Sequence, residues 1–194
     1  MEHWPSYLRG RLLEMFGRRD AALEDYRETL RINPAFASAR NRLAYLLAGR
    51  GRFDEAEGHF QRVVQAEPAN ATAHFNLGFT LEKLQRFEQA IESFREATRL
   101  KPGLDRAWYG MGMCEAHLGR HAQAVAAFIE AAKLQPMNPH AWYALGMAHH
   151  ATRNRDELKR VVLHLVRFDP RMARRLIVES ESTDLAYLVK DLAV

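Results

Sequence analysis

The chain has 194 residues, of which 47% are hydrophobic and 27% are charged, and its net charge is +4. This composition is ordinary for a folded protein and argues against intrinsic disorder. No apolar run approaches the roughly 18 residues of a membrane span, and the first residues lack the pattern of a secretory signal. A single cysteine, Cys114, excludes an internal disulfide. We therefore expect a cytoplasmic protein.

Proline divides the chain at a constant interval. Five prolines follow one another at spacings of 34 residues, namely Pro34, Pro68, Pro102, Pro136 and Pro170. A fixed period of this length indicates a repeat array. Aligned on these prolines, the chain divides into the repeats 3–36, 37–70, 71–104, 105–138 and 139–172, followed by the segment 173–194.

Each repeat is predicted to form two helices. Its apolar residues recur with a helical period in two runs, which are separated by a break near the middle of the repeat. The breaks fall at Gly17–Arg19, Gly49–Arg52, Leu84–Arg86, Gly119–Arg120 and Arg153–Asn154. We expect helices of about 12–14 residues joined by tight turns. Proline begins each following connection, because it cannot continue a helix but is tolerated in a first turn.

In chain order, the repeats carry apolar residues at matching positions. The first has Gly10, Leu13, Ala22 and Tyr26. The second has Leu43, Ala44, Leu47, Ala56 and Phe60. The third has Leu77, Gly78, Leu81, Ala90, Phe94 and Ala97, and the fourth has Trp108, Met111, Gly112, Ala124, Phe128 and Ala131. The fifth opens with Trp142, Leu145 and Gly146, but Leu158 and Val162 replace the later alanine and aromatic residue.

This pattern resembles the tetratricopeptide repeat family. The family pattern is Trp-x-x-Leu-Gly-x-x-Tyr, then Ala-x-x-x-Phe, then Pro, over 34 residues. The resemblance covers residues 3–172 and implies an all-α fold, a right-handed α-solenoid of about five helix-turn-helix repeats. The small residues, such as Gly78 and Gly112, would let the two helices of a repeat approach closely. Phe60, Phe94 and Phe128 would fill the space between one repeat and the next.

Residues 173–194 are predicted to cap the array with helical structure. Leu176 and Ile177 indicate an amphipathic helix in the place of a sixth first helix. Thr183 is a candidate N-cap for a final helix, whose apolar stripe would be Leu185, Leu188, Val189 and Leu192. This segment would cover the apolar face of the fifth repeat, or alternatively dock into a neighbouring copy.

The resemblance also implies a binding surface. In the family, the concave face of the solenoid is lined by the first helix of each repeat, and positions 2, 5, 9 and 12 of the repeat share one side of that helix. The candidate partner-binding residues here are Asn41, Tyr45, Phe75, Asn76, Phe79, Arg106, Tyr109, Met113, His140, Tyr143 and Met147. Aromatic and methionine side chains in such a strip suit capture of an apolar or amphipathic peptide.

Two features of this strip have alternative interpretations. Tyr109 and Tyr143 occupy a position that also packs within the repeat, so they are equally consistent with a structural role. Position 9 is more informative, because the family often has Asn there and this chain has Tyr45, Phe79, Met113 and Met147. Four exposed apolar residues in a row are costly without a partner, a bound tail or self-association.

The function expected from these residues is that of a protein-interaction scaffold or adaptor, chaperone-like in character, that holds a peptide or helix of another protein in the groove. The alternative is a structural protein whose copies assemble through the groove and terminal helices. The basic stretch 153–175, with eight Arg or Lys against three acidic residues, could bind an anion, although a solvated helix face is the simpler interpretation and nucleic acid binding is not expected.

No enzymatic activity, cofactor or metal is expected. The nine histidines do not combine with Cys or acidic residues at metal-ligand spacing, and Cys114 suits a packing role. No phosphate-binding glycine loop or nucleophile motif is present in the sequence. Asn76 and Arg106 are the nearest match to the family's carboxylate-binding cluster. Tyr45 and Gly110 occupy the companion positions, so that activity is not predicted.

Overall fold

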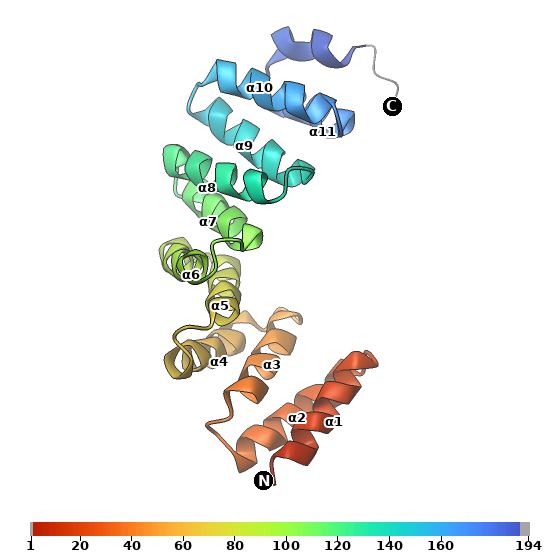
Figure 1. The fold of residues 1–194 in the computed structure, drawn as a ribbon, viewed down its shortest axis with the longest axis vertical. Helices are drawn as coiled ribbons and strands as arrows, with labels where there is room; N and C mark the ends of the chain where they lie inside the picture. Colours follow the sequence, from red (N-terminus) through yellow and green to blue (C-terminus); the bar gives the residue numbers. More distant parts are fainter. Residues whose placement is uncertain (1, 191–194) are drawn as a thin grey trace. The chain divides into compact units, whose positions relative to one another are not determined.

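A computed structural model describes residues 2–190, which form helices only (Figure 1). The helices of the first three repeats are α1 (Trp4–Met15), α2 (Arg19–Ile32), α3 (Ala37–Ala48), α4 (Phe53–Ala66), α5 (Ala71–Lys83) and α6 (Phe87–Leu100). They are followed by α7 (Asp105–His117), α8 (His121–Leu134), α9 (Pro139–Ala151), α10 (Arg155–Val166), α11 (Pro170–Glu179) and the 3-10 helix η1 (Thr183–Val189). The first ten helices form five pairs, one in each 34-residue repeat, which confirms the all-α helix-turn-helix fold.

Polar side chains mark where several of these helices begin. The side chains of Asn70 and Asn138 accept hydrogen bonds from backbone N–H groups in the first turns of α5 and α9. Asn154 and Asp169 do the same for α10 and α11. Such N-caps satisfy donors that have no partner within the helix. Proline occupies the first position of α9 and of α11. The backbone N–H group at this position has no partner within a helix, so proline can be accommodated there without loss of a hydrogen bond.

The turn inside each repeat has the same backbone conformation. One residue in each turn has a positive φ, and these residues are Gly17, Gly51, Gln85, Gly119 and Arg153 in chain order. They are spaced by 34 residues and lie in the breaks predicted from the sequence. The left-handed conformation suits glycine, whereas it strains the residues with a side chain, Gln85 (φ 59°) and Arg153 (φ 58°).

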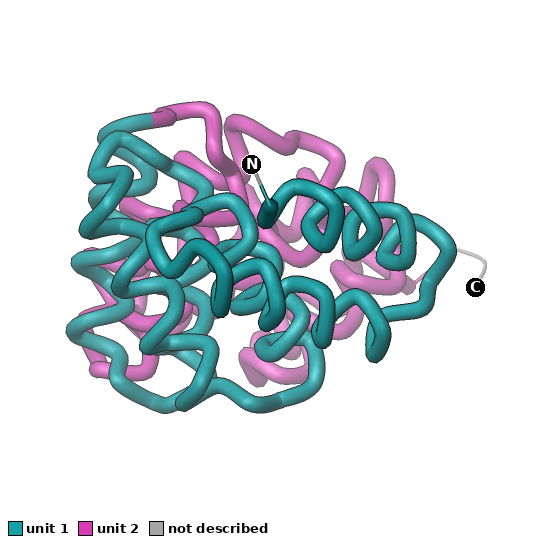
Figure 2. The backbone as a smooth tube through the Cα atoms, turned by 90° about the horizontal axis from the view of Figure 1, so that it is seen from below, with its two compact units in different colours: residues 1–100 teal, residues 101–194 magenta. Residues whose placement is uncertain are grey.

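The chain consists of two compact units, residues 1–100 and 101–194, each of which is described by itself (Figure 2). Unit 1 contains α1–α6 and unit 2 contains α7–η1. In unit 1, the first helices α3 and α5 contact one another, and in unit 2 the first helices α7 and α9 do so. Each unit therefore brings the first helices of neighbouring repeats side by side.

Glycine and an aromatic ring interlock inside the repeats. A Cβ atom added at Gly78 would lie 2.8 Å from Cδ1 of Phe94, and one added at Gly112 would lie 2.7 Å from Cδ1 of Phe128. Both rings are buried. These glycines thus allow the first helix to approach the aromatic side chain of the second, as the sequence predicts. In both cases the glycine and the ring belong to the same repeat.

The C-terminal segment caps unit 2, but its helices differ from the prediction. Because Asp169 caps α11 and Pro170 starts it, this helix begins within the last three residues of the fifth repeat. Thr183 is not an N-cap, since Ser182 precedes η1 and no side chain caps it. Leu185 and Val189 are buried, and Leu188 packs against the same core. Leu192 lies outside the described residues.

Candidate protein-binding surfaces

All the predicted partner-binding residues lie on the first helices of repeats two to five. Those in unit 1 form what we call the unit 1 surface, which consists of Asn41 and Tyr45 on α3 and Phe75, Asn76 and Phe79 on α5. The unit 2 surface consists of Arg106, Tyr109 and Met113 on α7 and His140, Tyr143 and Met147 on α9. Spacings of three or four residues place the members of each helix on one side of it, except that Asn76 directly follows Phe75 and points to a different side of α5.

Tyr45 is the most exposed member of the unit 1 surface. Its side chain is 56% exposed, whereas Phe75 and Phe79 are half-buried. The ring of Phe75 packs against Phe94, with 5.9 Å between the ring centroids. The ammonium group of Lys83 lies 5.0 Å from the centroid of the Phe79 ring, a cation–π contact. Tyr45 therefore offers more apolar surface to a partner than either phenylalanine.

Asn41 is a polar member of the unit 1 surface with an unusual environment. Its Oδ1 atom is buried and accepts no hydrogen bond from any residue between 2 and 190. A buried acceptor without a partner costs about 1–3 kcal/mol relative to a satisfied one. Asn76, on α5, is half-buried, and its backbone carbonyl accepts a hydrogen bond from the Thr80 hydroxyl at 2.8 Å.

The large apolar residues of the unit 2 surface are half-buried. Met113 and Met147 pack against the core of unit 2, and the ring of Tyr109 packs against Phe128 with 5.6 Å between centroids. The expectation that all four position-9 residues are exposed is therefore met by Tyr45 alone. Phe79, Met113 and Met147 each divide their surface between the core and solvent.

Tyr143 is already engaged by the C-terminal cap. Its hydroxyl donates a hydrogen bond to the carboxylate of Glu179 on α11, and the guanidinium carbon of Arg175 lies 4.8 Å from the centroid of its ring. Burial, followed by the contact with Glu179, raises the pKa of the tyrosine hydroxyl above its ordinary value. The cap thus covers part of one candidate binding residue. Arg106 and His140 lie at exposed positions.

Several cations of the basic stretch 153–175 stabilise the C-terminal segment. Arg155 forms an ion pair of 2.6 Å with Asp184, and Arg175 forms one of 2.7 Å with Glu179. Arg174 donates a hydrogen bond to the backbone carbonyl of Val189 at 3.1 Å. These contacts give the basic residues a structural role. Arg171 is exposed.

The structure also contains an apolar surface that the repeat pattern did not predict. Trp4, Leu8, Leu12 and Met15 on α1 are exposed, as is Phe16, which follows the helix. The spacing of three or four residues is visible in the sequence and could have indicated this stripe. Of these five residues, only Trp4 occupies one of the repeat positions 2, 5, 9 and 12 that were assigned to the concave face.

Among residues 2–190, no group of three or more His, Cys, Asp or Glu side chains lies close enough together to hold a metal ion. Cys114 is buried, in agreement with a packing role. None of the helices that the structure describes is long and apolar enough to cross a membrane.

Family models match most of the chain. A model described as tetratricopeptide repeat matches residues 7–71, 42–105 and 80–132, and a second, described as TPR repeat, matches residues 115–152. No curated protein matches the sequence.

Several solved structures share the fold of this chain. YrrB, described as a TPR protein with an unusual peptide-binding site, is 21% identical with a TM-score of 0.81, and the match covers 92% of this chain and 91% of that one. MamA is 21% identical with a TM-score of 0.78, and the match covers 99% of this chain and 97% of that one. A thermophilic TPR protein of Thermus thermophilus is 23% identical with a TM-score of 0.62, and the match covers 94% of this chain and 99% of that one. The repeat pattern, the helix pairs and the family match together show that the chain belongs to the tetratricopeptide repeat family.

Proposed function

We propose that this protein is an interaction scaffold that binds a peptide or helical segment of another protein through the unit 1 surface and the unit 2 surface. The family supports a scaffold, because tetratricopeptide repeats serve protein–protein interaction. The observation that carries the choice of surface is the exposure of Tyr45 on the first helix of the second repeat. Tyrosine is enriched among residues that dominate binding energy.

The composition of the two surfaces supports an apolar or amphipathic ligand. In unit 1, Tyr45 and the exposed part of Phe79 supply aromatic anchors. In unit 2, Met113 and Met147 supply flexible thioethers that adapt to different shapes. The polar groups that would orient the ligand are Asn76, Arg106 and His140. The similarity to YrrB, described as having a peptide-binding site, favours a peptide as the ligand class.

Two finer expectations belong to this proposal. A chaperone-like role would follow if the surfaces accept several apolar segments, which the adaptable methionines favour. A cytoplasmic location agrees with a single buried cysteine, since the fold then needs no disulfide.

A matched pair of tyrosine variants tests the proposal. Tyr45→Ala removes the exposed anchor of unit 1, whereas Tyr187→Ala removes a similarly exposed tyrosine (56% against 59%) from η1. We expect a partner captured from source-cell lysate by the wild type to be lost with Tyr45→Ala and retained with Tyr187→Ala. Titration of the purified partner should show weakening by about tenfold or more. Circular dichroism checks that both variants are folded.

Opposite results would reject the proposal. If the same partners bind Tyr45→Ala and a Phe79→Ala/Met113→Ala variant as well as the wild type, neither surface is the binding site. Light scattering over a concentration series tests the alternative of self-assembly. A strictly monomeric protein would reject that alternative, whereas reversible growth that Tyr45→Ala abolishes would favour it over a foreign partner.

A further inference from the structure

The first helix is apolar on two opposite faces. Tyr7 and Gly10 are buried on the side of α1 that packs against α2, the other helix of the first repeat. Leu8, Leu12 and Met15 lie on the opposite side and are exposed. A helix of a soluble protein normally presents a polar face to water, and a helix that is apolar all round is normally covered. The outer face of α1 therefore has the character of a buried surface.

The equivalent position in later repeats is covered by the repeat before it. Leu12 corresponds to Leu46, Thr80 and Ala148, which are 4%, 0% and 4% exposed, whereas Leu12 is 52% exposed. The helices that carry these three residues, α3, α5 and α9, each pack against the second helix of the preceding repeat. At Leu12, therefore, the outer face of α1 exposes a position that lies buried in later repeats.

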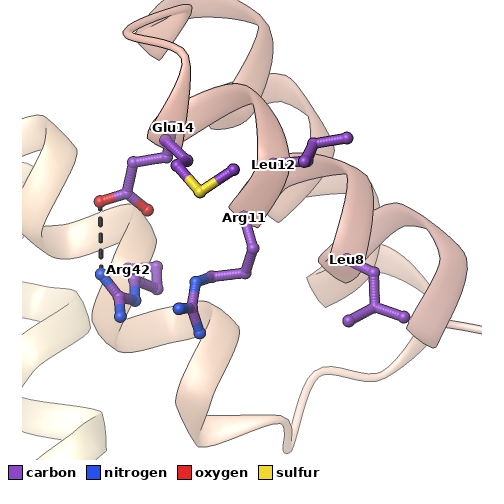
Figure 3. A pocket seen from close by; sticks show the side chains of 6 residues that line it. Leu8, Arg11, Leu12, Glu14 and Arg42 are labelled. Atoms are coloured by element: carbon purple, nitrogen blue, oxygen red, sulfur yellow. Dashed lines mark hydrogen bonds and ion pairs between the residues drawn. The ribbon is translucent and has the colours of Figure 1, made fainter.

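A charged hollow lies beside this apolar face, between α1 and α3 (Figure 3). Leu8, Leu12 and Met15 are its apolar lining residues, and its cationic ones are Arg11 and Arg42. Figure 3 shows Arg11 on α1 and Arg42 on α3. Its volume is about 440 Å³. The hollow offers a ligand both an apolar wall and two guanidinium groups.

The acidic groups near the hollow are already engaged. The carboxylate of Glu14 accepts hydrogen bonds from the Tyr26 hydroxyl at 2.8 Å and from Arg42 at 3.3 Å. Asp25 is bound by Arg9. Arg11 forms no ion pair with any residue between 2 and 190, and its guanidinium donates only to the Tyr7 hydroxyl, at 3.4 Å. The border of the apolar face therefore carries an excess of positive charge that a carboxylate would complement.

A second copy of the chain complements this border poorly. Arg11 and Arg9 lie on opposite edges of the apolar stripe. If two α1 helices paired antiparallel about a two-fold axis, each Arg11 would approach Arg11 of the other copy. If they paired in parallel, Arg11 would approach Arg9. The antiparallel pair therefore places like charges together, which opposes association. The parallel pair brings Arg11 to an arginine whose acidic partner, Asp25, is already engaged, so a partner with its own carboxylates fits the charge pattern better.

We propose that the outer face of α1 is a second docking surface, which receives an amphipathic helix of another protein with an apolar stripe bordered by Asp or Glu. The apolar stripe packs on Leu8, Leu12 and Met15, and a carboxylate at its border pairs with Arg11. This surface is separate from the unit 1 surface, since neither Tyr45 nor Phe79 lines the hollow.

Two synthetic helical peptides of about four turns test this proposal. Both carry leucine on one face, and the borders of that face are glutamate in one peptide and lysine in the other. Fluorescence anisotropy with a labelled peptide measures binding. We expect the glutamate peptide to bind saturably and at least about tenfold more tightly than the lysine peptide. Leu8→Gln/Leu12→Gln should weaken it by at least about tenfold, and Arg11→Gln should reduce its salt dependence.

Control variants connect the binding to this surface. Leu163→Gln/Val178→Gln changes two exposed apolar residues of unit 2 and should leave binding unchanged. Tyr45→Ala should also leave it unchanged, so failure here is distinguishable from failure of the proposed function. Equal binding of the two peptides, or no saturable binding, would overturn the proposal. A wild-type dimer that Leu8→Gln/Leu12→Gln converts to a monomer would overturn it as well, because a second copy would then be the occupant.

Discussion

Leu176 of α11 lies over Gly146 in the place where an aromatic ring lies over Gly78 and over Gly112 in the two repeats before it. A Cβ atom added at Gly146 would lie 2.5 Å from Cδ2 of Leu176, much as one added at Gly112 would lie 2.7 Å from Phe128. The fifth repeat has the smaller Val162 at the aromatic position. The C-terminal helix thus supplies the side chain that this repeat lacks, which explains why the cap is part of the core of unit 2.

Truncation of this side chain should therefore destabilise unit 2. Leu176 is completely buried, so Leu176→Ala leaves a cavity over Gly146 and should lower the free energy of unfolding by about 2–5 kcal/mol. Urea denaturation followed by circular dichroism measures the change. Leu163→Ala is the matched control, because Leu163 is 39% exposed and its truncation should lower the free energy of unfolding far less. Equal losses in the two variants would show that Leu176 does not complete the core.

The repeat could be predicted from the sequence because each repeat packs its two helices with similar residues at the same positions. The 34-residue period located all five turns, and the small residues predicted a close approach of the two helices of a repeat. The contacts of Gly78 with Phe94 and of Gly112 with Phe128 were not predicted, because these rings were expected to lie between repeats. The period gave an incomplete prediction in the fifth repeat, whose residues differ from those at the same positions of the other repeats. The replacement of the aromatic residue by Val162 was visible, but the insertion of Leu176 over Gly146 depends on a tertiary contact.

The candidate surfaces were predicted less completely than the fold. The helical period assigns Met113 and Met147 to a face, but their depth is set by the side chains that they meet in the core of unit 2. The engagement of Tyr143 by Glu179 depends on where α11 docks. The exposed stripe of α1 was missed because the repeat pattern assigns Leu12 to a position that is buried in the later repeats, whereas Leu12 is exposed.

The glycines of the first helices provide a second prediction. Gly112→Ala would place a methyl group against the ring of Phe128 and should lower the free energy of unfolding by about 1–3 kcal/mol. Gly58→Ala is the control, because Gly58 is exposed on α4 and nothing lies within 4 Å of an added Cβ. Alanine there should raise stability by about 0.5–1 kcal/mol through its helix propensity. The two substitutions should therefore shift the urea midpoint in opposite directions, and a shared direction would contradict the packing described.

The strained turn at Gln85 leads to a third prediction. Gln85 has a φ of 59°, where the neighbouring repeats have Gly51 and Gly119. Gln85→Gly should relieve the strain and raise the free energy of unfolding by up to about 1 kcal/mol, although added freedom of the unfolded chain offsets part of it. In contrast, Glu92→Gly, at an exposed position of α6, should lower it by about 1 kcal/mol. Thermal and urea unfolding would both reveal the difference, and a loss of stability in Gln85→Gly would contradict it.

A buried histidine predicts how stability depends on pH. His149 on α9 is 6% exposed, and its Nδ1 atom has no hydrogen-bond partner among residues 2–190. Burial lowers the pKa of its imidazole below the ordinary value of 6.5, and the nearby Glu157 opposes this effect only in part. Below about pH 6.5 the unfolded chain therefore takes up a proton that the folded chain does not. The free energy of unfolding that His149 contributes in its neutral form should therefore be fully present above about pH 6.5 and be lost as the pH falls below it.

A pair of neighbouring variants isolates this contribution. The free energy of unfolding, measured with urea between about pH 5 and pH 8, should fall toward low pH by up to about 1.4 kcal/mol per unit for each such proton. His149→Gln should flatten the curve, whereas His150→Gln, at the exposed adjacent position, should leave its slope unchanged. Part of the slope should remain in His149→Gln, because burial also lowers the pKa of His59. An unchanged slope in His149→Gln would show that its imidazole becomes charged without unfolding the repeat.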